Sequence, residues 1–509
     1  MKKYLLTATL LLLVGITASA YSFKTTNDGL CYDITGTSTV AVTFERNTDL
    51  NSTKASYENL GGDINIPETV YNGGKAYTVT AIADFAFFKC NLLTGVTFPK
   101  TVKTIGQYAF CCASSTASTS SHITSVTFAE GSELTEIGRY AFALTKITEV
   151  AIPNSVTTIG DYAFRYTFLV TANIPTSIQT MGKGVFLMCT TLTNISIPSG
   201  LTEIPESTFN NCSSLSSITL PSALTAIGES AFYKSGITSI SLPNSLTTIG
   251  RSAFESTPLT SITIPGSVTT IGGNAFESTQ LTTVTIPSTV TSLGSYAFSS
   301  ITTLKSAKIQ NSIISDYEFN NCRSLKEVTI GTGVESIGNQ PFNVCTSLET
   351  LNINSAMATD INQYFSEIKP TLKTVKIDNA VTAIPENAFL DCAALEIITI
   401  PSTITSIGNS AFSGCTALRE FYSLMDRPIT IDPSVFQDVP VDGTCDLHVP
   451  TGSKVRYEKK AVWEDFVIIL EDAGTGGGGT SGVRGDVNGD GVVSATDISI
   501  IVNILAGLE

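Results

Sequence analysis

The stretch "IGGNAFESTQLTTVTIPSTVTSLGSYAF", residues 271–298, contains one unit twice. Ile271-Gly-Gly-Asn-Ala-Phe276 returns 22 residues later as Leu293-Gly-Ser-Tyr-Ala-Phe298. A unit of this length carries one strip of apolar residues and cannot bury that strip alone. Stacked units share one continuous core. The repeat therefore predicts a solenoid.

A phenylalanine marks each unit along most of the 509-residue chain, and most neighbours in the series are 22 to 24 residues apart. We expect each ring to fill the core of one coil, which gives about sixteen coils stacked about 4.8 Å apart. The series is Phe87, Phe110, Phe142, Phe164, Phe186, Phe209, Phe232, Phe254, Phe276, Phe298, Phe319, Phe342, Phe365, Phe389, Phe412 and Phe436.

Each unit is expected to contain a short strand with one apolar side. In residues 259–264, Ile262 and Ile264 alternate with Ser261 and Thr263, which predicts that the isoleucines face inward. Pro265 ends the strand because it has no N–H to donate to a ladder. A second extended stretch over 268–271, a glycine turn and one helical turn at 275–276 complete the predicted unit.

Seven cysteines stand three residues after the phenylalanine, in a slot that holds threonine or serine in other units. Their wide spacing does not suit a zinc site, which needs closely spaced pairs that converge on one point. The exchange with threonine and serine favours buried packing over disulfides between coils. The seven are Cys90, Cys189, Cys212, Cys322, Cys345, Cys392 and Cys415.

The units resemble the BspA-like leucine-rich repeats of bacterial surface and secreted proteins, which follow L-x-x-[IV]-x-I-P-x-x-V-x-x-I-G-x-x-A-F-x-x-C. The match is clear in "ITEVAIPNSVTTIGDYAF" (147–164) and "ALEIITIPSTITSIGNSAFSGC" (394–415), and it covers roughly 66–436. The resemblance implies a mostly β solenoid with short helical turns, and adhesion to extracellular proteins. Coils within 308–365 lack the I-P and I-G marks, so we expect irregular structure there.

The first 20 residues have the organisation of a secretion signal. Lys2 and Lys3 precede a short apolar run, and Ala18-Ser19-Ala20 is an A-x-A cleavage site. A membrane anchor would need about 20 apolar residues, more than this run contains. The sequence therefore predicts a secreted or cell-surface bacterial protein without a membrane span.

The flanks of the repeats read as caps, because a stack would otherwise expose its core at both ends. Residues 21–62 are predicted to form a β-rich N-terminal cap, residues 63–420 the repeats, and residues 421–472 an irregular last coil and C-terminal cap. We expect Tyr457, Trp463 and Phe466 to cover the last coil. A Ser/Thr-rich insertion over 111–122 lengthens one coil.

After a Gly-rich linker (473–484), residues 485–509 read as a calcium loop followed by an amphipathic helix. Loop positions 1, 3, 5, 7, 9 and 12 supply oxygen atoms to a single Ca²⁺ ion. The expected ligands are Asp486, Asn488, Asp490, the Val492 carbonyl, Ser494 and Asp497. Aspartate at position 12 makes the segment similar to one repeat of a type I dockerin, which implies a cohesin-like partner or a second tail.

Composition and motifs argue against two classes of function. The net charge is −15 and the sequence shows no basic stripe, which argues against nucleic-acid binding. Only two histidines occur, His122 and His448, each expected at the surface, and no catalytic motif is recognisable. We therefore expect a protein that is not an enzyme.

The outward strand positions are the candidate binding face. We predict a broad hydrogen-bonding surface for an extracellular protein or glycan, although serine and threonine also suit exposed strands without any ligand. The alternative function is a non-catalytic, dockerin-targeted component of a polysaccharide-binding or -degrading assembly. The predicted face comprises Ser217, Thr219, Ser239, Ser241, Ser261, Thr263, Thr283 and Thr285.

Overall fold

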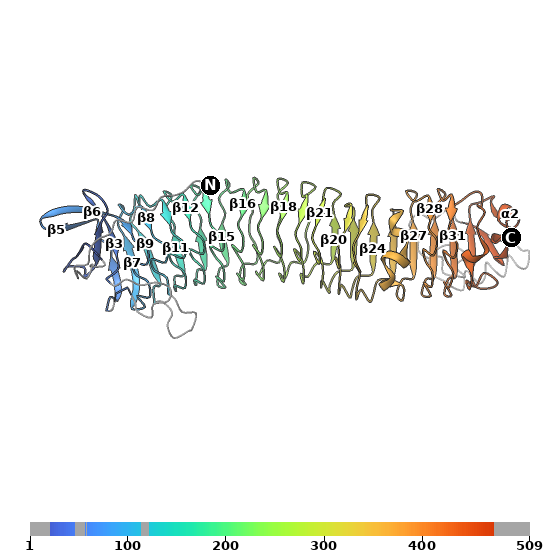
Figure 1. Ribbon diagram of the computed structural model, residues 1–509, viewed down its shortest axis with the longest axis horizontal. Coiled ribbons are helices and arrows are strands. Elements are labelled where there is room, and N and C mark those ends of the chain that lie inside the picture. The colour runs from blue at the N-terminus through green and yellow to red at the C-terminus, as the bar shows by residue number, and fades with distance from the viewer. Residues whose placement is uncertain (1–20, 46–55, 58, 113–121, 473–509) are drawn as a thin grey trace, which may run out of the picture. The chain divides into compact units, whose positions relative to one another are not determined.

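The computed structural model describes residues 21–45, 56–57, 59–112 and 122–472 (Figure 1). The predicted signal peptide (1–20), most of the insertion (113–121) and the predicted linker and calcium tail (473–509) lie outside the described residues. The chain forms two compact units. Among the described residues, unit 1 comprises those up to Leu325 and Ser336–Cys345, and unit 2 comprises Lys326–Glu335 and those from Thr346 to Asp472.

Unit 1 begins with antiparallel strands and continues as parallel coils, each of which repeats the preceding turn of the chain. β1 (Phe23–Lys24), β2 (Cys31–Ile34) and β3 (Thr39–Thr43) pair antiparallel, and β5 (Thr69–Asn72) forms a hairpin with β6 (Lys75–Ile82). From β6 onward the pairing is parallel between successive coils. The mostly β solenoid predicted from the repeat is therefore confirmed.

One side of unit 1 carries two-residue strands from the Thr-Ile-Gly part of each repeat. β6 pairs with β8 (Thr104–Ile105), which continues through β10 (Glu136–Ile137) and β12 (Thr158–Ile159) to β14 (Thr180–Met181). A second ladder runs through β16 (Glu203–Ile204), β17 (Ala226–Ile227), β18 (Thr248–Ile249), β19 (Thr270–Ile271) and β21 (Ser292–Leu293). β23 (Ile313–Ile314) pairs with β25 (Ser336–Ile337).

The glycine of this motif allows the coils to approach closely on that side. A Cβ atom at Gly272 would lie 2.4 Å from the backbone nitrogen of Arg251 in the preceding coil, and one at Gly294 would lie 2.2 Å from that of Gly273. Real Cβ atoms do not come so close to backbone, so a side chain here would push the coils apart. In these coils the glycine of the I-G mark is thus required by the packing.

The other side carries the longer strands predicted from the L-x-x-[IV]-x-I-P part of the repeat. β4 (Gly62–Asn65), β7 (Leu93–Phe98) and β9 (Ser125–Phe128) pair in parallel, as do β11 (Glu149–Ala151), β13 (Thr171–Asn173) and β15 (Asn194–Ser196). β20 (Thr283–Ile286) pairs with β22 (Ser306–Ile309).

Three consecutive coils depart from the predicted strand pairing. The sequence pattern predicts strands at three segments that belong to no strand of the structure: residues 217–220, 239–242 and 261–264. Across the same coils the short-strand ladder β16–β19 stays closed. The coils therefore keep their strand pairing on the glycine side. On the long-strand side, backbone hydrogen bonds remain at the start of the segments, from Thr238 to Ser216 at 3.0 Å and from Thr260 to Thr238 at 3.3 Å, but no strand pairing follows them.

The Ala-Phe segment forms a third ladder, and the predicted helical turn there is wrong. Backbone N–H groups of Asn274, Phe276 and Ser278 donate to carbonyls of the next coil at 2.8–3.1 Å. The N–H groups between them close turns within their own coil. Asn274 and Ser278 have positive φ angles of 60° and 57°, which no helix contains.

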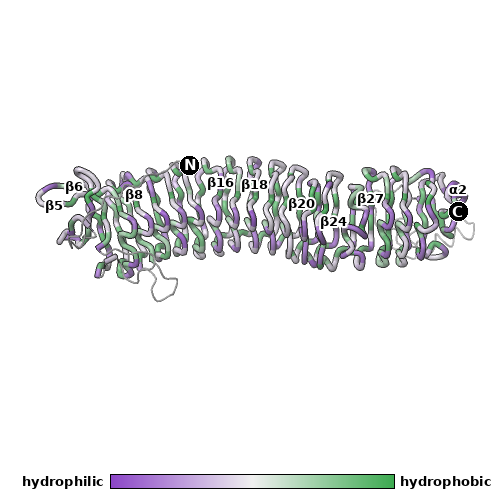
Figure 2. The backbone as a smooth tube through the Cα atoms, viewed as in Figure 1, coloured by the Kyte–Doolittle hydropathy of each residue, from purple (hydrophilic) through white to green (hydrophobic). Residues whose placement is uncertain are grey.

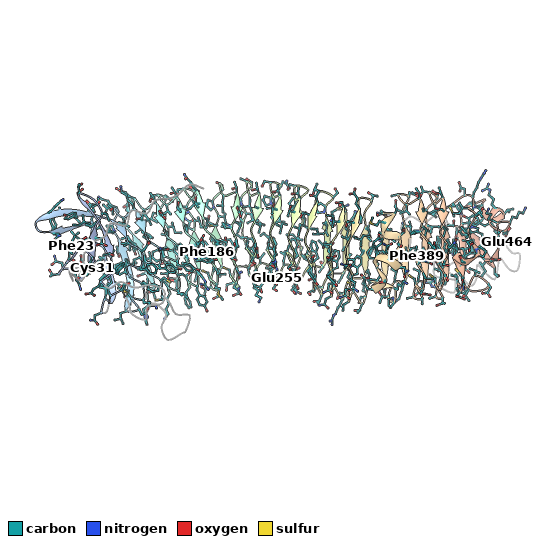
Figure 3. All side chains as sticks on the ribbon, viewed as in Figure 1. Phe23, Cys31, Phe186, Glu255, Phe389 and Glu464 are labelled. Carbon is teal, nitrogen blue, oxygen red and sulfur yellow. The ribbon has the colours of Figure 1, made fainter. Side chains whose placement is uncertain are left out.

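The predicted phenylalanine stack is confirmed within each unit. Phe276 is fully buried, and its ring lies 5.4 Å from Phe254 and 5.2 Å from Phe298, within 8° of parallel. Phe186 and Phe389, labelled in Figure 3, are equally buried. Figure 2 shows the same recurrence of apolar residues along the backbone. Burial of these rings, together with the aliphatic side chains around them, stabilises each coil.

The described part of unit 2 contains several short helices, a separate pair of short strands and one long parallel sheet. Its strands are β24 (Glu327–Ile330), β26 (Thr350–Ile353), β27 (Thr374–Ile377), β29 (Ile397–Ile400), β31 (Glu420–Ser423), β32 (Asp446–Val449) and β33 (Ile468–Glu471). β28 (Ala383–Ile384) pairs with β30 (Ser406–Ile407). The helices are η1 (Met357–Thr359), α1 (Ile361–Tyr364), η2 (Ser366–Ile368), η3 (Pro433–Phe436), α2 (Lys454–Tyr457) and η4 (Trp463–Asp465).

The three rings predicted to cover the last coil do so. Trp463 and Tyr457 are fully buried, and Phe466 is nearly so. The Trp463 ring meets Phe436, the last ring of the series, edge-on at 5.6 Å, and its Nε1–H donates to the Ile429 carbonyl at 2.9 Å. The only tryptophan of the chain is therefore structural.

The ladder cysteines are buried free thiols, and five of them donate to the preceding coil. The Sγ atoms of Cys189, Cys212 and Cys322 donate to the carbonyl of the preceding coil's phenylalanine at 3.2 Å. In the same slot the Thr257 and Thr279 hydroxyls donate to the phenylalanine carbonyl of their own coil at 2.8 Å. All eleven cysteines are free.

We expect these thiols to resist alkylation in the folded protein. Burial raises the pKa of Cys189 to about 11 and that of Cys392 to about 12, so almost no thiolate forms at neutral pH. Mass spectrometry should show unmodified cysteines after native treatment with iodoacetamide, and complete modification after unfolding without reductant. A Cys189–Cys212 disulfide in the unreduced protein would contradict this packing.

Candidate binding face

The eight hydroxyl residues predicted as a binding face are all exposed on the long-strand side of unit 1. Among their inward neighbours, Ile264 and Val284 are buried, at 7% and 4% exposure. The alternation read from the sequence is therefore confirmed for the orientation of these side chains.

The structure brings six of the eight residues together in a groove of about 700 Å³, which we call the serine groove. Thr219 and Thr285 are exposed but do not line it. The groove extends across the three coils that lack strand pairing on the long-strand side. The six lining residues from the prediction are Ser217, Ser239, Ser241, Ser261, Thr263 and Thr283.

Apolar side chains form part of the lining of the serine groove, which sequence reasoning missed. Ile218, Ile240 and Ile262 are half-buried and line it. The corresponding Ile195 and Val284, in strands that remain paired, are only 6% and 4% exposed. Where the strand pairing is lost, the isoleucines are accessible between the hydroxyl groups. No charged side chain belongs to this lining.

A second groove on the same side, of about 670 Å³, was not predicted; we call it the asparagine groove. Its lining includes Glu149, Asn173, Asn194 and Ser196, at the outward positions of β11, β13 and β15. In register, Glu149 lies beside Thr171, and Thr171 beside Asn194. The outward positions of these strands carry the same alternation in sequence, but their side chains are amides and a carboxylate as well as hydroxyls.

The corresponding face of unit 2 is more charged. Glu327 and Lys376 occupy outward strand positions, and the Asn352 side chain donates to Glu327 Oε1 at 2.7 Å. Toward the C-terminal strands, the His448 ring stacks on Tyr422 at 4.1 Å and shares a 2.7 Å hydrogen bond with Asp472. The predicted surface position of His448 is therefore wrong, because the residue is 6% exposed.

Two observations bear on histidine and metal sites in the described residues. His122 is exposed, and its Nδ1 lies 2.6 Å from the Asn91 carbonyl oxygen. Within residues 21–472, excluding the gaps given above, no three His, Cys, Asp or Glu side chains gather to hold a metal ion. The six predicted calcium ligands, residues 486–497, lie outside this part of the chain.

Comparison with known proteins gives one family and several structures. The model of the "BspA type Leucine rich repeat region" matches in 6 copies, over residues 75–189, 114–237, 225–315 and 312–440. The chain resembles the crystal structure of a leucine-rich repeat protein from Bacteroides ovatus at 25% identity and a TM-score of 0.59, covering 79% of this chain and 94% of that one. No curated protein matches.

Two further solved structures are more distant. A leucine rich cell surface protein from Faecalibacterium prausnitzii is 24% identical with a TM-score of 0.29, and the match covers 80% of this chain and 96% of that one. The pneumococcal vaccine antigen PcpA is 17% identical with a TM-score of 0.33, over 88% and 98% of the two chains.

Proposed function

This chain belongs to the BspA type leucine rich repeat family, and on that premise we propose that it is a non-catalytic binding protein that adheres to extracellular proteins. The serine groove is the observation that carries the proposal. It places exposed hydroxyl groups and accessible isoleucines together on one side of three successive coils. Solenoid proteins bind their ligands on an extended side of this kind.

The chemistry of the serine groove favours a protein over a glycan. Accessible aliphatic side chains bordered by polar groups have the anatomy of a protein interface, which has an apolar centre and a polar rim. No aromatic ring lines the groove, so a sugar would find no flat face on which to stack. Because the lining carries no charge, we expect binding to depend weakly on salt.

We further propose that the protein acts outside the bacterial cell, secreted or held at its surface. The support is the signal-like organisation of residues 1–20. Among the described residues, no helix has the length and apolar character that a membrane crossing requires. Detection of the protein, with its N-terminus at Tyr21, in culture medium or on intact cells would test this.

Blocking the serine groove should abolish adhesion. Replacing Ser241 and Thr263 together by arginine fills the groove with two long charged side chains. We expect at least a tenfold loss of affinity, about 1.4 kcal/mol, for any extracellular-matrix protein captured from a panel by residues 21–509. Biolayer interferometry with the wild type and the variant would measure it.

The matched control places the same two charges on the opposite side of the same coils. Thr247 and Thr269 are exposed there, beside β18 and β19, and their replacement by arginine should leave affinity unchanged. Equal losses in both double variants would show that charge, and not the groove, governs binding. If the wild type bound glycans on an array but no protein of the panel, the proposal of a protein partner would be contradicted.

A second function is favoured by the dockerin-like tail: targeting of this binding protein to a polysaccharide-degrading assembly. We propose that Asp486, Asn488, Asp490, Ser494 and Asp497, with the Val492 carbonyl, bind one Ca²⁺. Titration calorimetry of the full chain should give one calcium site, which Asp490→Ala should weaken at least tenfold. The control Asp442→Ala, at an exposed position of unit 2, should bind like the wild type.

A cohesin-like domain immobilised on beads then distinguishes the two roles of the tail. Calcium-dependent capture of the full chain would support the assembly. Calcium binding without capture would leave the tail as a site for another partner, and no calcium heat at millimolar concentration would contradict the loop altogether.

A further inference from the structure

The last strand of unit 2 has one free edge in the described part of the chain. β33 pairs in parallel with β32, ends the strand order of its sheet and contacts α2. Alternate residues of a strand point their backbone N–H and C=O groups toward opposite edges. Half of those groups in β33 therefore point away from the sheet, as a template for another strand.

This edge lacks the lysine, proline and bulge that often keep sheet edges from pairing. Protected edges carry lysine, proline, a bulge or a cover, whereas residues 467–471 read Val-Ile-Ile-Leu-Glu and pair with β32 in unbroken register. Val467 is 68% exposed and Leu470 is 38% exposed. The Glu471 carboxylate is engaged by the N–H groups of Gly452 and Lys454 at 3.1 and 2.9 Å.

We propose that β33 pairs antiparallel with β33 of a second copy of this chain. A two-fold axis at Ile469 would bring Ile468 opposite Leu470 of the other copy, and the reverse, so that aliphatic side chains meet in both cross-strand pairs. The same axis sets Glu471 against Val467. The two carboxylates therefore do not face each other, and the strand is complementary to itself.

The interface is short, so the dimer should be weak and concentration-dependent. Sedimentation velocity on residues 21–509, from low micromolar to submillimolar concentration, should show a monomer–dimer equilibrium. Leu470→Lys should raise its dissociation constant at least tenfold, because a lysine on the edge opposes pairing and an exposed side chain contributes little to folding. Val170→Lys is the control, since Val170 is similarly exposed, at 43%, and lies in unit 1.

Hydrogen exchange supplies the second measurement. The amides of residues 468–471 should become more protected as the wild type is concentrated, and should not do so in Leu470→Lys. A chain that stays monomeric overturns the proposal, even if these amides are protected at every concentration by another segment such as residues 473–509. A dimer that Leu470→Lys leaves intact overturns it equally.

Discussion

Phe276→Ala is expected to lower the free energy of unfolding by about 3–5 kcal/mol, as for other fully buried aromatic side chains. The ring has no exposed surface and is held between Phe254 and Phe298 at 5.4 and 5.2 Å. Its removal leaves a cavity in the continuous core and breaks two ring contacts at once. Because each coil contacts only its neighbours, the damage should begin in the adjacent coils.

Urea unfolding and hydrogen exchange of the wild type and the variant would measure both effects. The exchange of amides in residues 250–300 should rise before that of unit 2. Thr263→Ala is the matched control from the same repeat, because its side chain is exposed, and it should change stability by less than about 0.5 kcal/mol. A Phe276→Ala protein as stable as the wild type would mean that the ring does not carry the core.

The sequence was most informative where one physical requirement repeats. Each coil must bury one ring, so the phenylalanine series predicted the ring stack. The alternation around Ile262 and Ile264 was right for Ile264, which is buried, whereas Ile262 is half-buried and lines the serine groove. The C-terminal rings were predictable for the same reason, because a stack must end in something that covers Phe436.

Local conformation was less predictable, because different structures satisfy the same apolar pattern. The Ala-Phe segment was expected to be helical, yet it uses positive φ angles at Asn274 and Ser278, which are not glycines. The loss of strand pairing over residues 217–264 could not be predicted from the sequence either. The Ile-x-[Leu/Ile]-Pro motif stands there much as in the paired strands, and so the apolar part of the serine groove could not be foreseen.

Glu318 is an exception to the repeat, because it places an acidic side chain at a position that is buried in the other coils. It occupies the place of the alanine in Ala-Phe, where Ala275 and Ala297 are fully buried, and it is itself fully buried. Ser315 donates its backbone N–H to Oε2 at 2.8 Å and lies where other repeats have glycine. The other oxygen, Oε1, is buried without a hydrogen-bond partner among the described residues.

We expect this carboxyl group to make the stability of unit 1 pH-dependent. Burial raises the pKa of Glu318 from 4.5 to about 8, because an ion with one unpartnered oxygen is disfavoured away from water. The folded state therefore retains a proton that the unfolded chain releases above its pKa of 4.5. The stabilisation is complete below pH 4.5 and is lost as pH rises toward 8, at about 1.4 kcal/mol per pH unit.

Between pH 5 and pH 8 the loss should thus be about 4 kcal/mol in the coils around Glu318. Hydrogen exchange across residues 290–325, with rates corrected for intrinsic pH dependence, would measure it locally. Glu318→Gln and Glu318→Ala both remove the titrating group, so the difference between wild type and each variant should change with pH by the same amount, whatever each substitution costs in packing. If that difference is constant from pH 5 to pH 8, Glu318 is ionised in the folded protein, and a counter-ion or a solvent path must reach its buried oxygen.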